Sequence, residues 1–446
     1  MFLKKYILLL IAIALPMVVL GQELSLDSCL RLAVVNNADI KNADLAIKEA
    51  EQTKKAVVTK YFPAFSASAQ AFHSDKPYIE LGISDIKSNV VRDVLQVIYD
   101  NIGELLGVED HISFLRNGVV AGVVAVQPVY AGGRIVTGNK LANLGIEAST
   151  YQRQIAERDL LLNTEELYWQ IKMLEEKLKT VKTVLGLLDN LEKDVRVALQ
   201  AGLITPNDGL RVKLKINEMN SNVIKIENGI KLSKRALCQQ IGIEYSDDIC
   251  LTDSVAEIKS PWEYMVDNSV AVQGRSEYKL LELNVKASRL QKRMIIGESL
   301  PQIGFGGAYT YNNLLEKGRT NLTGFATIQV PLTAWWESAH NIKKQNFKIE
   351  EAENMQSDVT AKLELQTQKI WDELEAAYRS FLLAEQAVED AQSNMRMSSQ
   401  YYNAGLIPLS DLLEAQTLYR NALDTRIEQS IAYIICLRHY KQITEH

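Results

Sequence analysis

Cysteine, basic clusters and long apolar segments are scarce in this chain, and each scarcity excludes a class of protein. Four cysteines among 446 residues are too few for the disulfide framework of a small secreted scaffold. A formal net charge of −6 with no basic cluster gives no reason to expect nucleic acid as a partner. Beyond the first 20 residues or so, charged residues interrupt every long stretch, so no further helical membrane span is expected.

The chain also lacks the motifs of catalysis and of cofactor binding. Gly132-Gly133-Arg134 has neither the lysine nor the spacing of a phosphate-binding loop. Gly304-Phe305-Gly306-Gly307 is interpreted as a strand with small residues, not as a dinucleotide loop. The five histidines show no metal-binding spacing. We therefore expect no enzyme activity, no cofactor and no metal site. The histidines are His73, His111, His340, His439 and His446.

The first 22 residues have the layout of a secretory signal peptide. Lys4 and Lys5 precede an apolar run from Tyr6 to Leu20, which is shorter than a membrane span and contains Pro16. Cleavage is expected near Gly21-Gln22, and an uncleaved anchor is the alternative. In the oxidising compartment that this implies, Cys238 and Cys250 could pair, although free buried cysteines are an equal alternative.

Two stretches of the chain repeat one another. Ala201-Gly202-Leu203-Ile204 with Asp208 returns as Ala404-Gly405-Leu406-Ile407 with Asp411, at an offset of 203 residues (404 − 201). Upstream the offset is 238, from Pro63 to Pro301 (301 − 63), so the first copy holds 35 extra residues (238 − 203). The sequence predicts two structural repeats, residues 23–260 and 261–446, with the extra residues in a loop at 74–116.

Each repeat contains a long helical hairpin. Apolar residues recur at alternating steps of three and four, which is the pattern of a coiled coil, and the same register holds in both copies. Gly202 and Gly405 suit the left-handed residue that ends a helix, and Thr205 with Asp208 forms a predicted capping box. The hairpins turn near residues 201–208 and 404–411. In the first copy the periodic positions are Leu160, Leu167, Ile171, Leu174, Leu178, Val181, Leu185, Leu188, Val195 and Leu199.

Four segments of about ten residues have the composition of strands, and ten residues suffice for a tilted strand to cross a bilayer. In the third segment Phe305 and Tyr309 alternate with Gly304 and Thr310. Trp335 and Trp336, which follow the fourth, suit an interfacial aromatic belt or a buried cluster. The four segments are Ala64 to His73, Gly118 to Gln127, Gln302 to Tyr311 and Asn321 to Val330.

Four strands cannot enter a membrane alone. An open sheet has two unpaired edges, and each backbone group without a partner in lipid costs several kcal/mol. Copies of the chain must therefore complete a closed barrel: two copies supply eight strands, and three supply twelve, which is enough for a lumen. The alternative is a periplasmic coiled-coil scaffold or adhesin without a pore, in which the strands form a soluble sheet.

The ordered motifs of the mature chain resemble those of TolC-type outer-membrane efflux proteins. This resemblance implies an α+β membrane protein: a trimeric transmembrane β-barrel with four strands per chain, continued by a long periplasmic α-helical coiled-coil barrel. It also implies a belt around Ile241 to Trp262 and the chain ends. The motifs are Leu24-Ser25-Leu26-Asp27, Asn36-Asn37, Tyr61-Phe62-Pro63, Gln127-Pro128-Val129-Tyr130, Gly132-Gly133-Arg134 and Ala404-Gly405 through Gln416.

The role that the resemblance implies is the exit duct of a tripartite efflux or type I secretion system. Its expected partners are two further copies of the chain, a periplasmic adaptor, an inner-membrane pump and outer-membrane lipid. Transport energy would come from the pump, since this chain has no nucleotide site. The sequence names no cargo.

The resemblance also assigns residues to an entrance gate. Asp411 and Glu414 match an acidic ring, and being three residues apart they share one helix face. Asp208 and Tyr402 match positions that tie neighbouring helices closed, whereas Ile407 replaces a basic latch residue of some members. Three copies of each carboxylate around one axis would favour cations. The alternative is that these acids only cap and solvate a helix start.

The apolar turns are candidate docking sites for the adaptor. Exposed apolar residues at a turn lower solubility unless a partner covers them, which favours this reading for Gly202-Leu203-Ile204 and Gly405-Leu406-Ile407. The alternative is that these side chains pack the turns. In the insertion, Ile86 to Leu106 is predicted to be an amphipathic helix outside the cell or over the barrel mouth. A lid, a partner site and a packing element all remain open for it.

Overall fold

The computed structural model describes residues 23–77, 79–103, 111–114, 117–202, 204–254, 258–314 and 318–444. The predicted signal peptide and Leu203 lie outside the described residues. Two compact units are present, and each draws on both predicted repeats. One comprises Met1–Lys48, Glu147–Leu283 and Glu353–His446, and the other comprises Glu49–Ile146 and Asn284–Ala352.

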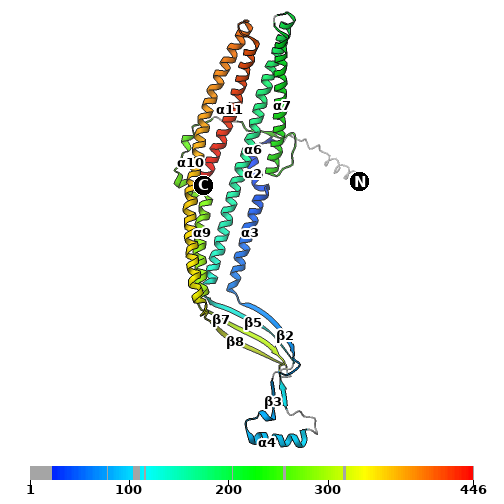
Figure 1. Ribbon diagram of the computed structural model, residues 1–446, viewed down its shortest axis with the longest axis vertical. Helices are drawn as coiled ribbons and strands as arrows, with labels where there is room; N and C mark the ends of the chain where they lie inside the picture. Colours follow the sequence, from blue (N-terminus) through cyan, green and yellow to red (C-terminus); the bar gives the residue numbers. More distant parts are fainter. Residues whose placement is uncertain are drawn as a thin grey trace, which may run out of the picture. The chain divides into compact units, whose positions relative to one another are not determined.

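A four-stranded antiparallel sheet forms the centre of the second unit (Figure 1). Its strands are β2 (Ala64–His73), β5 (Asn117–Ala131), β7 (Gln302–Asn312) and β8 (Arg319–Gln329), in the order β2-β5-β7-β8. The four strands predicted from the sequence are thereby confirmed. Strands β2 and β8 are the two edges, so each has one side without a partner strand among the described residues.

Strand β5 is longer than predicted, because it continues past Pro128 to Ala131. Proline has no N–H for the ladder, and the pairing of β5 with β7 shifts register between Pro128 and Tyr130. This irregularity is a β-bulge, the place where a strand accommodates a proline. Pro128 is therefore inside the strand, not at its end.

The registers sort the side chains of the sheet onto two faces. Phe305 is paired with Ala326, and Tyr309 is paired with both Val123 and Leu322. Because side chains alternate along a strand, one face is almost wholly apolar. The opposite face carries mainly small and polar residues, together with five larger apolar ones: Phe72, Val120, Val124, Val126 and Phe325. The apolar face holds Phe65, Ala67, Ala69, Ala71, Val119, Ala121, Val123, Ala125, Ile303, Phe305, Tyr309, Tyr311, Leu322, Ala326 and Ile328.

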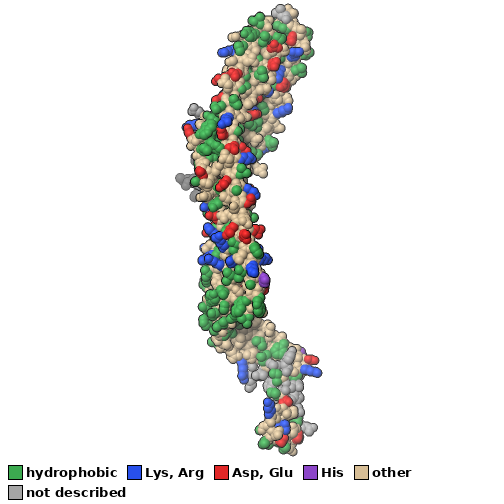
Figure 2. Space-filling model, turned by 60° about the vertical axis from the view of Figure 1, so that its left-hand side comes forward, with side chains coloured by type: hydrophobic (Ala, Val, Ile, Leu, Met, Phe, Trp, Pro, Cys, Tyr) green, Lys and Arg blue, Asp and Glu red, His purple; other side chains and the backbone are tan. Residues whose placement is uncertain are grey.

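Exposed hydrophobic side chains also gather where β8 is followed by helix α10 (Ala334–Asn403) (Figure 2). Leu332, Trp335 and Trp336 are 61, 52 and 76% exposed. The indole N–H of Trp335 donates to the carbonyl oxygen of Ser299 at 2.8 Å. The alternative of a buried aromatic cluster is wrong for this pair, and exposed tryptophans beside strand ends are typical of a membrane interface.

The insertion between β2 and β5 forms a small substructure at the ends of these strands (Figure 1). Strands β3 (Ile79–Gly82) and β4 (His111–Phe114) pair with each other, and between them lie a 3-10 turn η2 (Ile83–Asp85), helix α4 (Asn89–Ile98) and a π turn η3 (Tyr99–Gly103). The amphipathic helix exists, but it begins later than the predicted Ile86. Residues 104–110 lie outside the description.

Four helices contribute residues to both units: α3 (Ala38–Val58), which leads through η1 (Thr59–Tyr61) to β2, α6 (Arg134–Gln200), α9 (Ser276–Glu298) and α10. The first unit adds α2 (Leu26–Asn36), α7 (Pro206–Ile241), α8 (Asn268–Gly274), η4 (Pro261–Tyr264) and α11 (Leu409–Thr444). No described helix combines the length and the apolar character needed to cross a membrane.

The helical cores of the first unit confirm the predicted periodicity. Leu160, Ile171 and Val181 on α6 are buried, as are Leu363, Ile370 and Leu374 on α10. Two buried threonines occupy equivalent positions in the two repeats: Thr164 and Thr367 are 203 residues apart (367 − 164). Each threonine hydroxyl donates to the backbone carbonyl four residues before it. The long helices are stabilised by burying these stripes, since helix propensity alone contributes little.

The predicted belt segment does contact both ends of the described chain. Strand β6 (Cys250–Leu251) pairs in parallel with β1 (Glu23–Leu24). On the C-terminal side, the hydroxyl of Tyr433 donates to the carbonyl of Lys259 at 2.5 Å. All four cysteines are free, so the possible pairing of Cys238 with Cys250 is not formed: Cys238 is buried and Cys250 is exposed.

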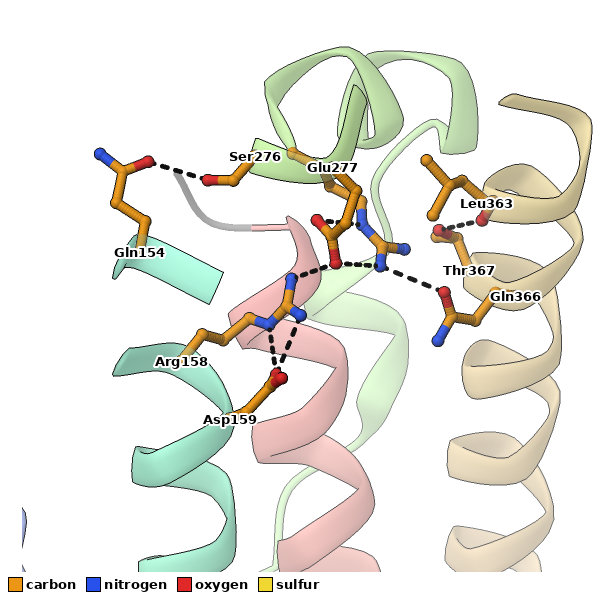
Figure 3. A network of polar contacts seen from close by, with 9 residues as sticks. Gln154, Arg158, Asp159, Ser276, Glu277, Leu363, Gln366 and Thr367 are labelled. Carbon is orange, nitrogen blue, oxygen red and sulfur yellow. Dashed lines mark hydrogen bonds and ion pairs between the residues drawn. The ribbon is translucent and has the colours of Figure 1, made fainter. Parts of the chain in front are cut away.

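A polar network joins α6, α9 and α10 within this unit (Figure 3). The guanidinium of Arg275 is buried and donates to Glu277 and to Gln366, each at 3.1 Å. Arg158 reaches the same Glu277 carboxylate at 2.7 Å. Burial alone would raise the pKa of Glu277, but the hydrogen bond and charge of Arg275 and the charge of Arg158 bring that pKa below its ordinary value. The carboxylate therefore binds two arginines from different segments.

Candidate functional site

The two hairpin tips have the same backbone geometry. After α10, Gly405 has a φ of 71°, its N–H donates to the carbonyl of Tyr402, and the N–H of Leu406 donates to the carbonyl of Tyr401. After α6, Gly202 has a φ of 73° and donates to the carbonyl of Leu199. These are the bonds of a Schellman motif, in which glycine supplies the left-handed residue. The predicted helix ends are confirmed.

The first tip restarts as a helix through a complete capping box. The hydroxyl of Thr205 accepts from the N–H of Asp208 at 3.4 Å, and the Asp208 carboxylate accepts from the N–H of Thr205 at 3.1 Å. Pro206 occupies the first turn of α7. Within one chain, the hydrogen bonds that the structure shows for Asp208 all go to Thr205. Asp208 is thus part of its own helix cap, as the capping-box prediction requires.

The second tip presents the two acids proposed for the gate. Asp411 lies in the first turn of α11, where its N–H donates to the carbonyl of Pro408 and the hydroxyl of Ser410 donates to its carboxylate at 2.9 Å. Asp411 and Glu414 are exposed, whereas Leu412 and Ala415 on the adjoining face of the helix are buried. Both carboxylates therefore lie on one solvent-facing stripe.

Tyr402 lies between the hairpins. It packs partly against a cluster that joins the tips, which contains Val212 of α7 and Leu409 of α11. Burial raises the pKa of the Tyr402 phenol, and the negative charges of Asp208 and Asp194 raise it further. The phenol is protonated at neutral pH, as an ordinary tyrosine already is, and can donate a hydrogen bond to an acid. Asp208 lies close enough to Tyr402 for its charge to affect the phenol.

The apolar residues of the tips differ in exposure. Leu406 is 70% exposed, whereas Ile204 packs partly against the tip cluster and Ile407 is half-buried. Packing of the turn accounts for Ile204, and it does not account for Leu406. Gly202 and Gly405 are also exposed.

A polar stripe on α11 is a feature that sequence reasoning missed. Gln416, Arg420 and Asp424 each have a buried polar side-chain atom without a hydrogen-bond partner in the described structure. Gln416 and Arg420 line a small hollow with Met219 of α7. Burial raises the pKa of the Asp424 carboxyl, against the opposing charge of Arg420 at 3.9 Å. The sequence feature that could have revealed this stripe is the spacing of four residues, which places all three side chains on one helix face.

Among the described residues, no group of three or more histidine, cysteine or acidic side chains is placed to hold a metal ion. The tips instead combine backbone turns, exposed carboxylates and one exposed leucine. Such an arrangement offers charge and contact surface, and these are the means by which a constriction selects ions and a turn binds a partner.

Comparison with solved structures identifies the fold as that of outer-membrane efflux channels. The chain matches CusC with a TM-score of 0.76 at 12% identity, over 95% of this chain and 92% of that one. It matches VceC of Vibrio cholerae with a TM-score of 0.72 at 14% identity, over 94% and 96%. CmeC of Campylobacter jejuni gives a TM-score of 0.72 at 14% identity, over 94% and 85%.

The sequence carries the same signal in its second half. Residues 271–432 match the family of outer membrane efflux proteins, a range that includes β7, β8 and the second hairpin with its tip. No curated protein sequence matches the chain significantly. The resemblance to TolC-type proteins is confirmed, and it extends at the level of the fold over nearly the whole described chain.

Proposed function

We propose that three copies of this chain form an outer-membrane channel, the exit duct of a tripartite efflux or type I secretion system. The duct conducts substrates passively from a periplasmic adaptor and an inner-membrane pump to the exterior. A cleaved signal peptide would deliver the chain, and the helical part would lie in the periplasm. The proposal assigns the chain no catalytic step and no cofactor.

The sorting of side chains on the sheet is the observation that carries this proposal. Phe65, Leu322 and Ile328 on the apolar face are 73, 84 and 71% exposed. In water these residues would form a large apolar patch, which monomeric soluble proteins rarely tolerate. In a membrane the same face meets lipid. The opposite face, with Ser66, Ser68, Thr323 and Thr327, would line an aqueous lumen.

The free edges of the sheet explain why a trimer is proposed. Strands β2 and β8 each need a partner, and the only strand surface of matching length that every copy offers is the other edge of its neighbour. Pairing β8 of one copy with β2 of the next closes a ring and leaves no edge. Twelve strands give a lumen, whereas eight are filled by side chains.

The tips would form the periplasmic entrance of this channel. Asp411 and Glu414 are the proposed acidic ring, Asp208 and Tyr402 the proposed closing contacts, and Leu406 the centre of the proposed adaptor site. The exposure of both acids supports the ring, and the exposure of Leu406 supports docking.

Purified protein in planar lipid bilayers tests the proposal. We expect a trimer in detergent, retention in the membrane pellet after a high-salt wash, and discrete ion-conducting steps. A monomeric, freely water-soluble protein that passes no ions would refute the channel and would favour the scaffold or adhesin. The heat-denatured protein is the control for conductance.

A further inference from the structure

The insertion between β2 and β5 contains a helix whose apolar face has no partner among the described residues. On α4, Val90, Val94 and Val97 are 75, 55 and 59% exposed, and Ile98 is 52% exposed. Their positions along the helix place them on one face, together with Val91. No residue of 74–103 whose side chain is described is buried. The described side chains of the insertion therefore form no buried core.

The polar face of α4 is satisfied within the helix. Arg92 donates to the side chain of Asn89 at 3.0 Å and lies 3.9 Å from Asp93, and Gln96 donates to Asp100 at 3.0 Å. This face needs no further partner and suits contact with water. Only the apolar face of α4 therefore still needs a surface to shield it from water.

The supporting hairpin has the same character. In the part of the insertion that the structure describes, strands β3 and β4 pair only with each other, and an isolated two-stranded hairpin is marginal in water. Ile79 and Leu81 share one face of β3 and are 45 and 52% exposed. The apolar side chains of the hairpin and of the helix that it carries are both exposed. We therefore expect another surface to cover them.

We propose that the surface is the same element in the other two copies: three α4 helices pack through their apolar faces around the threefold axis and cap the outer mouth of the channel. This inference rests on the proposed trimer. The insertion leaves the sheet from β2, the edge strand that must pair with a neighbour, so the interface between copies continues directly into the insertion.

Charge disfavours a membrane surface as the occupant. Residues 74–116 hold eight acidic and four basic residues, a net charge of −4 (4 − 8). Helices that lie on membranes are typically rich in lysine and arginine on the polar face, which attract anionic headgroups. The polar face of α4 has one arginine and one aspartate at its centre, Arg92 and Asp93. Packing against copies needs no such attraction.

Cysteine crosslinking in outer membranes tests the cap. Val94→Cys is placed in the apolar face and Gln96→Cys in the polar face as a matched control, both in a background with Cys250→Ser and Cys436→Ser. A short bismaleimide should join Val94→Cys chains into dimers, up to about two-thirds of the chains because three thiols around one axis form one pair. A trivalent maleimide should yield covalent trimers. Gln96→Cys should give at least about tenfold less of either product.

The assembly state of each variant is measured separately by native mass spectrometry. A trimer in which Val94→Cys does not crosslink overturns the cap and leaves the proposed channel standing, as does equal crosslinking of both variants. Quenching of a fluorophore on Val94→Cys by brominated lipid would show that the face lies in lipid, which also overturns it. Absence of a trimer in the unsubstituted protein refutes the proposed function itself.

Discussion

Gly132 and Gly297 are in direct backbone contact where β5 ends and α9 approaches its last turn. A Cβ on Gly132 would lie 2.0 Å from the carbonyl oxygen of Gly297, and a Cβ on Gly297 would lie 2.5 Å from the carbonyl oxygen of Gly132. Gly132 also has a φ of 62°. Neither clash involves a side chain that could move away, so the two backbones fix the junction between this strand and this helix.

Gly132→Ala should therefore lower the free energy of unfolding by about 3 kcal/mol, because it adds a backbone overlap to a strained φ. Gly133→Ala is the matched control: Gly133 has a φ of 75°, but no atom lies within 4 Å of its Cβ position. We expect it to cost only about 1–2 kcal/mol. Thermal unfolding followed by circular dichroism measures the difference. Equal effects of the two substitutions would mean that the contact with Gly297 is unimportant.

Glu277→Gln should remove a pH-dependent part of the stability. The folded pKa of Glu277 lies below its ordinary value of 4.5, so the carboxylate contributes stability above that pH and loses it as the pH falls through the folded pKa. The side chain is 23% exposed, so we expect a loss of about 2 kcal/mol at pH 7, less than for a fully buried pair. The gap between the two proteins should narrow below pH 4.5.

This prediction is checked by measuring the thermal unfolding midpoints of Glu277→Gln and of the unsubstituted protein between about pH 7 and about pH 3.5. Asp159→Asn is the control, because Asp159 is half exposed and contacts only Arg158 among the network residues. A constant difference between Glu277→Gln and the unsubstituted protein across this range would contradict the assignment of the pH dependence to Glu277.

The strands and hairpins could be predicted from the sequence because each depends on a local period. Alternation in β7 and β8 and the three-four spacing of α6 and α10 are visible in single segments. The turns followed from glycine and from Thr205 with Asp208, whose geometry is set within four residues. The continuation of β5 past Pro128 could not be seen, because a bulge depends on the partner strand β7.

Contacts between distant segments were not predictable. Arg275 and Glu277 lie close together in the sequence and look like ordinary surface charges, and only the packing of the helices brings Arg158 and Gln366 to them. The stripe of Gln416, Arg420 and Asp424 was equally hidden, because burial decides whether a polar side chain matters. The gate residues were named from the family resemblance. The structure of a single chain adds that Asp411 and Glu414 are exposed, and it contains no neighbouring copies that could contact them.

Asp411→Ala combined with Glu414→Ala tests the acidic ring. Removing these carboxylates from three copies should reduce the preference of the channel for cations by a factor of about 3 or more at 0.01 M salt, and much less at 1 M, where the Debye length is about 3 Å. Reversal potentials in planar bilayers measure the preference. The control is Glu385→Ala with Glu389→Ala, two exposed acids on α10 away from the tip. An unchanged preference would leave the two acids as helix-capping residues only.

Tyr402→Phe tests the closing contacts. The phenol is protonated at neutral pH, as an ordinary tyrosine already is, and burial and the charges of Asp208 and Asp194 raise its pKa further, so it is available as a donor to an acid of a neighbouring helix. Loss of one such bond, worth about 0.5–1.5 kcal/mol, should increase the occupancy of the open channel by a factor of about 2–10. Tyr401→Phe is the control, since Tyr401 is adjacent and 50% exposed. Identical open probabilities for both variants would exclude Tyr402 from the closed state.

Leu406→Cys tests adaptor docking at the second tip. Leu406 is 70% exposed at a turn where its own N–H donates to the carbonyl of Tyr401, so its side chain is available to a partner. Leu383→Cys is a matched control, because Leu383 is 73% exposed on α10 but lies some 20 residues before the turn, about 30 Å along the helix. In cells that also produce the periplasmic adaptor, a photoactivatable label on residue 406 should crosslink to the adaptor at least about fivefold more than the label on residue 383. Because the two leucines are equally exposed, a general attraction between apolar surfaces would label both alike. Such a result would contradict docking at the tip, and preference for residue 406 would show that position at the turn, not hydrophobicity alone, selects the partner.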